Sequence, residues 1–189
     1  MFGQFLNIVV RSIKLDKTLY KDNKNFGEAA IYFAIIIILI TAIIGLIPGS
    51  IFLKFMGGIF GSSNIQGPSI RSVIISTIIV WIIKTAYLYF VGVVLFPSKG
   101  TKCSYRKILV SVGYASAPLI LNAFIVDAKL LYFIFIPYIW YNVSLIIGIN
   151  HILKFESYFK SSLIVLGPII ILFLFFISQL FGSYSSTIS

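Results

Sequence analysis

The chain has few residues that could perform chemistry. Its 189 residues include one Cys, one His and only five Asp and Glu together, and charged residues make up 11%. The lone Cys103 cannot close an internal disulfide, and the scattered acids form no metal-ligand or acid–base spacing. HExxH, CxxC, GxSxG and Walker motifs are also absent. The sequence therefore argues against an enzyme and predicts neither a cofactor nor a metal.

Apolar residues, by contrast, are abundant. They make up 59% of the chain, more than a soluble domain of this length could bury. Five runs reach the roughly 20 residues that a helix needs to cross a bilayer. They are Phe26–Leu53, Ser72–Phe96, Ile108–Val126, Leu130–Leu153 and Ser161–Phe181. These runs show no two-residue alternation, so the backbone must be satisfied within helices. The sequence predicts an all-α integral membrane bundle of five transmembrane helices.

The first 25 residues have a different pattern. An apolar helical face is expected opposite a polar one that carries Arg11 and Lys14, which predicts an N-terminal amphipathic helix in the membrane interface. The apolar face comprises Phe2, Phe5, Leu6, Val9, Val10 and Ile13. Leu15–Asn25 is expected to be a polar, Lys-rich connector. The predicted organisation is therefore an N-terminal region over 1–25, a transmembrane domain over 26–182 and a polar tail over 183–189.

The net charge is +10, and the basic residues are spread among the loops, so they indicate membrane topology rather than nucleic-acid binding. Eleven basic residues precede the first run, or lie between the second and third or the fourth and fifth, against three on the other side. This bias predicts a cytoplasmic N-terminus and an outside C-terminus. On the outer side, an irregular segment is expected over Lys54–Arg71 because of its glycines, and a tight hairpin at Asp127–Lys129.

Lys84 lies about twelve residues from either end of its run, at a depth where a charge is costly. We expect a polar pocket inside the bundle, in which oxygen atoms of Asn122, Tyr141 and Asn142 surround the ammonium. Snorkelling toward the membrane surface is the alternative. A hydrated cavity around Lys84 would favour transport, whereas a side chain directed at lipid or at a freed carbonyl would favour a structural role.

Small residues in the third run indicate close helix packing. Gly113 and Ala117 are separated by three residues, a spacing that lets helices approach, and Pro118 predicts a kink. Ile108 is expected to face lipid. Pro137 and Pro168 predict further kinks in the fourth and fifth runs.

The stretch from Leu95 to Pro118 resembles the Yip family of integral membrane proteins, whose members have a Gly-containing loop followed by a span with Gly-Tyr and a later Pro. Here these are Gly100, Gly113-Tyr114 and Pro118. The region from Ile139-Trp140-Tyr141 to Phe159-Lys160-Ser161-Ser162 is similar to the family's fourth span and following loop. The resemblance implies a five-span bundle with a cytoplasmic N-terminus. Eukaryotic members carry an Asp-Leu-Tyr-Gly-Pro motif and are linked to Rab GTPases; this chain lacks the motif and resembles the short prokaryotic branch.

Two functions follow as hypotheses. The first is a non-enzymatic membrane organiser that binds membrane lipids, other membrane proteins or itself, without a Rab-type GTPase and without nucleic acid. The second is a small channel or carrier subunit with Lys84 lining a polar path. The expected location is the inner (plasma) membrane, or an endomembrane if the source is eukaryotic.

Overall fold

The chain is all-helical throughout the part that this computed structural model describes, residues 2–59, 67–98 and 103–185. Within these residues five helices are long and apolar enough to cross a membrane. They are Ala30–Gly58, Ile70–Leu95, Tyr105–Phe124, Ala128–Ile152 and Tyr158–Phe175. The predicted fold class, an all-α protein with five membrane-spanning helices, is confirmed.

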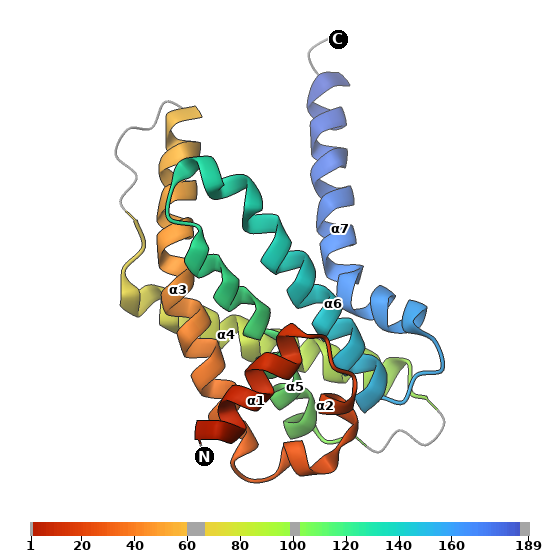
Figure 1. Ribbon diagram of the computed structural model, residues 1–189. Helices are drawn as coiled ribbons and strands as arrows, with labels where there is room; N and C mark the ends of the chain where they lie inside the picture. Colours follow the sequence, from red (N-terminus) through yellow and green to blue (C-terminus); the bar gives the residue numbers. More distant parts are fainter. Residues whose placement is uncertain (1, 60–66, 99–102, 186–189) are drawn as a thin grey trace.

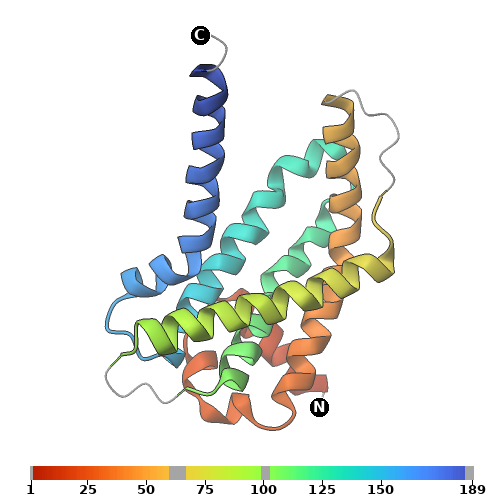
Figure 2. The same ribbon diagram turned by 180° about the vertical axis from the view of Figure 1, so that it is seen from behind.

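Several of these spans are composite. The first is α3 (Ala30–Ile59); the second is α4 (Ile70–Tyr89), which continues as a π-helical segment, η2 (Phe90–Leu95). The third joins α5 (Tyr105–Ala115) to a 3-10 segment, η3 (Ala117–Phe124). The fourth joins the 3-10 segment η4 (Ala128–Ile134) to α6 (Phe135–Ile152), and the fifth is α7 (Tyr158–Ser185). Figures 1 and 2 show that α4 crosses α3 and α7 steeply, so the spans do not form a parallel bundle.

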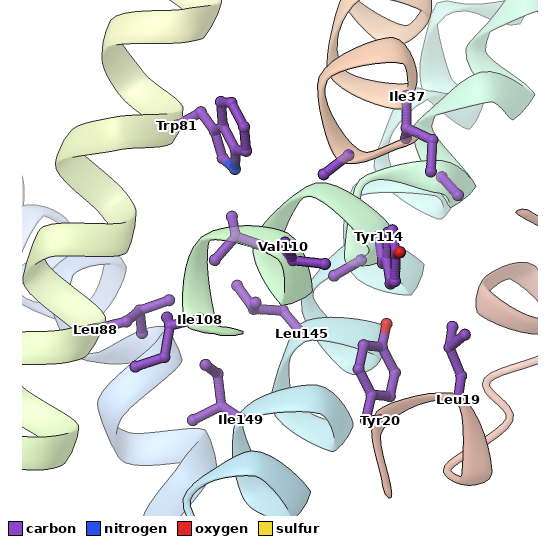
Figure 3. Packing of buried hydrophobic residues seen from close by; sticks show 14 of the residues in the cluster. Leu19, Tyr20, Ile37, Trp81, Leu88, Ile108, Val110, Tyr114, Leu145 and Ile149 are labelled. Carbon is purple, nitrogen blue, oxygen red and sulfur yellow. The ribbon is translucent and has the colours of Figure 1, made fainter. Parts of the chain in front are cut away.

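The core forms around α5, which contacts α1, α3, α4 and α6. Val110, Val112 and Tyr114 of this helix are almost completely buried. Figure 3 shows Trp81 and Leu88 of α4 on one side of α5, with side chains of α6 and of the N-terminal region on the other. Antiparallel packing of η3 beside α6 follows from the short connection between Phe124 and Ala128, as the predicted hairpin required.

The first span differs from its predicted bounds. We expected Phe26–Leu53 followed by an irregular Gly-rich segment, but α3 begins at Ala30 and continues through Gly57 and Gly58 to Ile59. Phe55 of this extension and the preceding Phe52 line one apolar cavity together with residues of η4 and α6, and α3 contacts η4 directly. Of the rest of the expected irregular segment, residues 60–66 lie outside the described residues, 67–69 have no regular secondary structure, and α4 begins at Ile70.

Prolines mark changes of helix geometry. Pro118 lies in the first turn of η3, where α-helical hydrogen bonding gives way to 3-10 geometry. Pro168 lies inside α7, and Figure 1 shows this helix turning sharply after its first turns. Each proline removes an N–H and clashes with the preceding turn, which accounts for both changes. Pro137, in contrast, is in the first turn of α6, where its missing N–H costs little.

The N-terminal region is more firmly attached than predicted. α1 (Phe2–Ile13) is the expected helix, but its predicted apolar face divides: Val9 is buried together with the neighbouring Ile8, whereas Phe2, Leu6 and Val10 are exposed. The predicted polar connector instead contains α2 (Thr18–Lys21) and η1 (Asn23–Phe26). Leu19 and Tyr20 of α2 are in the core, so the Lys-rich composition of this segment concealed two anchoring residues. At the other terminus α7 continues to Ser185, and residues 186–189 lie outside the described part of the chain.

Candidate functional site

One face of α4 lines an open cavity of about 420 Å³. Ser76, Thr77, Val80, Trp81 and Lys84 recur at helical spacing, so their side chains share this face. The Trp81 indole donates a 3.0 Å hydrogen bond to the Leu109 carbonyl and thereby fixes α4 against α5. The remaining wall residues come from the other four spans: Ile38, Thr41, Val112, Ser116, Leu119, Tyr138, Tyr141, Asn142 and Ile169.

Lys84 contacts an aromatic ring rather than an oxygen atom. Its Nζ lies 4.4 Å from the centroid of the Tyr141 ring, a cation–π geometry. Tyr141, one of the expected neighbours, is therefore beside the ammonium, but it contributes its ring rather than its oxygen. Within the described residues no carboxylate pairs with Lys84.

The two predicted asparagines lie in different places. Asn142 lines the cavity; its Nδ2 donates to the Tyr138 carbonyl at 2.8 Å, and its buried Oδ1 has no partner among the described residues. Asn122 is buried in η3 but does not line the cavity. The structure thus brings together Lys84, Tyr141 and Asn142 and leaves Asn122 out. The position of Asn122 could not be predicted from the sequence, because the 3-10 geometry of η3 changes which residues of the span share a face.

The cavity lies about midway along the helices that line it. Thr41, Ser116 and Tyr141 belong to three different spans, and each is eleven residues from the helix end nearest α1 and α2. Eleven residues correspond to about 16 Å along a helix, close to half of a hydrocarbon core about 30 Å thick. The mouth is formed by side chains that are half exposed, Val80, Tyr138 and Ile169. These residues belong to candidate spans, so the cavity opens on the side of the bundle rather than in a loop.

A second polar cluster attaches the N-terminal region to the bundle. The buried Ser12 hydroxyl donates to the Tyr114 carbonyl at 2.6 Å and lies 3.3 Å from Ser144 Oγ. The Tyr20 hydroxyl is 2.9 Å from the same Ser144 oxygen. Gly148 makes room for this contact, because a Cβ there would lie 2.9 Å from the Tyr20 ring. Burial raises the pKa of Tyr20, so its hydroxyl remains a donor at neutral pH.

The turn between α1 and α2 is closed by charge. Asp16 accepts from the Thr18 amide and hydroxyl and from Arg11 Nε, at 2.7–2.8 Å. The hydrogen bonds from Thr18, and then the one from Arg11, lower the pKa of Asp16 to about 2. Leu15 has a φ of 55°, the left-handed conformation that reverses the chain here. The turn directs Lys14 and Lys17 to the exposed surface.

The close-packing residues lie inside the bundle. A Cβ on Gly113 would be 2.6 Å from Ala34 Cβ of α3, so this glycine allows the two helices to touch. Ala117 is completely buried, and Pro118 follows it at the start of η3. Ile108, which we expected to face lipid, is completely buried against the core; that expectation was wrong because α5 is the central helix.

The first residues of α5 lie at the end of the bundle where α1 and α2 lie (Figure 1), and two of them are basic. Arg106 donates to the Gly27 and Glu28 carbonyls, and Lys107 Nζ donates to Asn23 Oδ1, so the start of α5 contacts the N-terminal region directly. Lys99 and Lys102, also expected on this side, lie outside the described residues. Within the described part of the chain, no group of three or more His, Cys, Asp and Glu is placed to hold a metal ion.

Comparison with known families agrees with this architecture. The family model described as the Yip1 domain matches residues 17–179, which include all of the spans except the last turns of α7. No curated protein and no solved structure matches the chain. The matched region begins within the turn between α1 and α2, so it includes the anchoring Tyr20 as well as the Lys84 cavity. The chain is therefore a multi-pass membrane protein that belongs to the Yip family.

Proposed function

We propose that this protein is a non-enzymatic membrane organiser whose N-terminal region binds anionic lipid head groups on the cytoplasmic side. The observation that carries the proposal is the exposed apolar stripe Phe2, Leu6 and Val10. These residues recur every four positions, so they form a row on α1 that no other part of the described chain covers. An uncovered apolar row on a surface helix is suited to insertion between lipid head groups.

Charge supports the same orientation. Lys14, Lys17, Lys21 and Lys24 are exposed on the segment that follows the row. A basic side chain near an anionic leaflet contributes about 1 kcal/mol of attraction at moderate salt. Ser12 and Tyr20 fix the region to the bundle, so the row and the lysines are held in a constant relation to the membrane. The proposed cytoplasmic placement rests on the eleven-to-three bias of basic residues in the sequence.

An environment-sensitive fluorophore tests this proposal. Cys103→Ser removes the single native thiol, and Leu6→Cys then carries the label. In vesicles that contain phosphatidylglycerol the label should shift to shorter wavelength than in phosphatidylcholine alone, and high salt should reduce the shift. Asn7→Cys, exposed beside the row, is the matched control and should shift less. Identical spectra in both lipids would refute anionic lipid binding.

Partner binding has its own candidate surface. Ile169–Phe175 of α7 are all exposed, and seven consecutive residues cover the whole circumference of a helix. This part of α7 is free to pack against another membrane helix, from a second copy or a different protein. Cross-linking through Phe173→Cys in native membranes, in the Cys103→Ser background, would detect such a partner; a lipid-only environment would give no cross-linked species.

A small carrier or channel subunit is the second candidate, because Lys84, Tyr141 and Asn142 line a cavity at mid-depth. A polar path would require water to reach this cavity from both ends. Thiol-reactive water-soluble reagents should then label both Thr77→Cys and Ser116→Cys in the Cys103→Ser background. Protection of both positions would exclude the path.

A further inference from the structure

We propose that the Lys84 cavity binds the anionic head of an amphiphile that enters from the lipid phase. The site is separate from the N-terminal region that is proposed above to contact the membrane surface, and it uses different residues. Its ligand is an oxyanion, a carboxylate or a phosphate, carried on a hydrocarbon chain. Three features of the cavity define this chemistry: its charge, its unused hydrogen-bonding groups and its opening.

The charge comes first. Lys84 presents an ammonium at a depth where a cation is costly, and within the described residues it has a tyrosine ring but no carboxylate. A ring face satisfies one side of an ammonium, which has three N–H donors. An oxyanion in the cavity would accept the remaining hydrogen bonds and offset the charge. Lysine thus supplies an anion site that the chain itself leaves open.

The polar groups around Lys84 complement an oxygen-rich head. Thr41, Ser76 and Ser116 donate their hydroxyl protons to carbonyls of their own helices, at 2.9–3.0 Å, so they supply no proton to the oxyanion and can only accept from a hydroxyl on the head group. No hydrogen bond within the described chain uses the hydroxyls of Tyr138 and Tyr141, which leaves them as donors to the same oxyanion. The buried, unpartnered Oδ1 of Asn142 would in turn accept from a hydroxyl on the head group.

The opening determines where the ligand comes from. Val80 is 60% exposed, Tyr138 49% and Ile169 51%, and all three are span residues at the mouth. The mouth therefore faces hydrocarbon, and a water-soluble anion would have to leave water and cross lipid to reach it. An amphiphile instead arrives through the bilayer. Its chain would lie along the apolar residues Ile38, Val80 and Ile169 while its head contacts Lys84.

Trp81 gives a direct readout of occupancy. It lines the cavity, whereas the other tryptophan, Trp140, lines a different surface hollow with Ile136, Ile139 and Val143. Trp140→Phe leaves Trp81 as the single emitter, and it removes an indole N–H that is buried without a partner among the described residues. Bromine atoms on a hydrocarbon chain quench the fluorescence of a nearby indole, so a brominated amphiphile in the cavity would reduce the fluorescence of Trp81.

The experiment uses the full chain with Trp140→Phe in phosphatidylcholine nanodiscs. Brominated stearate and brominated phosphatidylglycerol should quench Trp81 saturably, and whichever saturates at the lower mole fraction identifies the head group. Their uncharged counterparts, brominated stearyl alcohol and brominated diacylglycerol, should quench only in proportion to concentration. If charged and uncharged probes behave alike, the proposal is wrong, and this comparison needs no change at Lys84.

Variants then test the residue. Lys84→Met should raise the half-saturating mole fraction of the anionic probe about tenfold or more, as expected for loss of one charge-assisted hydrogen bond, while Lys84→Arg should keep saturation. Lys129→Met, which removes a lysine at the start of η4 that does not line the cavity, should leave the half-saturating mole fraction unchanged. Unchanged saturation in Lys84→Met overturns the proposal.

Two further arms separate the alternatives. Acetate and inorganic phosphate should fail to compete with the brominated probe; competition would identify a water-soluble ligand and refute entry from lipid. Leu6→Gln, in the exposed row of α1, should leave the quenching unchanged, so a failure of the N-terminal lipid-binding proposal is distinguishable from a failure of this one.

Discussion

Replacing Gly113 by alanine should destabilise the protein because it forces α5 away from α3. The added Cβ would lie 2.6 Å from Ala34 Cβ and 3.0 Å from Ala34 Cα, against an optimal carbon–carbon separation of about 3.5–4.0 Å. The second of these atoms belongs to the backbone, so no side-chain rotation relieves the clash. The helices must separate by about 1 Å, in the most buried part of the molecule.

Overpacking of this kind costs about 1–3 kcal/mol, which corresponds to a fall of about 2–12 °C in Tm for a protein of this size. The assay is the loss of monodisperse protein after heating in detergent, followed by size exclusion. Gly45→Ala is the matched control, since a Cβ there meets nothing within 4 Å and alanine has the higher helix propensity. Its Tm should be unchanged or slightly higher.

A compensating change makes the reasoning sharper. Ala34→Gly removes the nearer of the two atoms that the new Cβ meets and leaves the backbone contact at 3.0 Å, so the double variant Gly113→Ala with Ala34→Gly should recover part of the lost Tm. If Gly113→Ala is as stable as Gly45→Ala, or if the double variant is less stable than the single one, the close contact between α3 and α5 is not what fixes these helices.

Four other measurements test separate parts of the structure. The pKa of Asp16 is lowered from 3.8 to about 2, so its contribution to holding α1 against α2 should be complete above pH 4 and disappear as the pH falls through about 2. Pepsin cleavage before residue 25, normalised to an unstructured peptide, should therefore increase as the pH falls to about 2. Asp16→Asn should remove this pH dependence. Burial raises the pKa of Cys103 to about 11, so its native thiol should react with a maleimide at neutral pH about a hundredfold more slowly than after denaturation in SDS. Tyr20→Phe leaves Ser144 with a weakened hydrogen-bond network and should speed hydrogen exchange in α1 and α2 while α5 stays protected. A reporter active only outside the cytoplasm should work when fused after Ser189; activity of a cytoplasmic reporter there would reverse the predicted orientation.

The positions of the spans were predictable because transmembrane helices have a simple physical requirement. About 20 apolar residues must follow one another, and the runs satisfy this whatever they pack against. Where α3 ends was not predictable in this way. Gly57 and Gly58 have low helix propensity, but η4 and α6 supply a packing surface that overrides it.

Contacts between residues far apart in the sequence could not be predicted either. The Gly113 spacing pointed to a close approach, yet nothing in the sequence identified Ala34 as its neighbour. The polar composition of Leu15–Asn25 concealed Tyr20, whose role depends on Ser144 and Gly148 in a span more than 120 residues later. Lys84 stood out because a charge in an apolar run is rare, but the ring of Tyr141 beside it depends on how α4 crosses α6.

The hydrogen bond between Tyr20 and Ser144 also determines when, during synthesis, the N-terminal segment can dock. The two residues are 124 positions apart, so at about 5–20 residues per second the ribosome needs about 6–25 s to make the second after the first. During this interval the N-terminal segment has left the ribosome without its docking site on α6. Its uncovered apolar residues and its lysines can engage the membrane surface before the fourth span exists. The segment that is made first is therefore among the last to reach its final place.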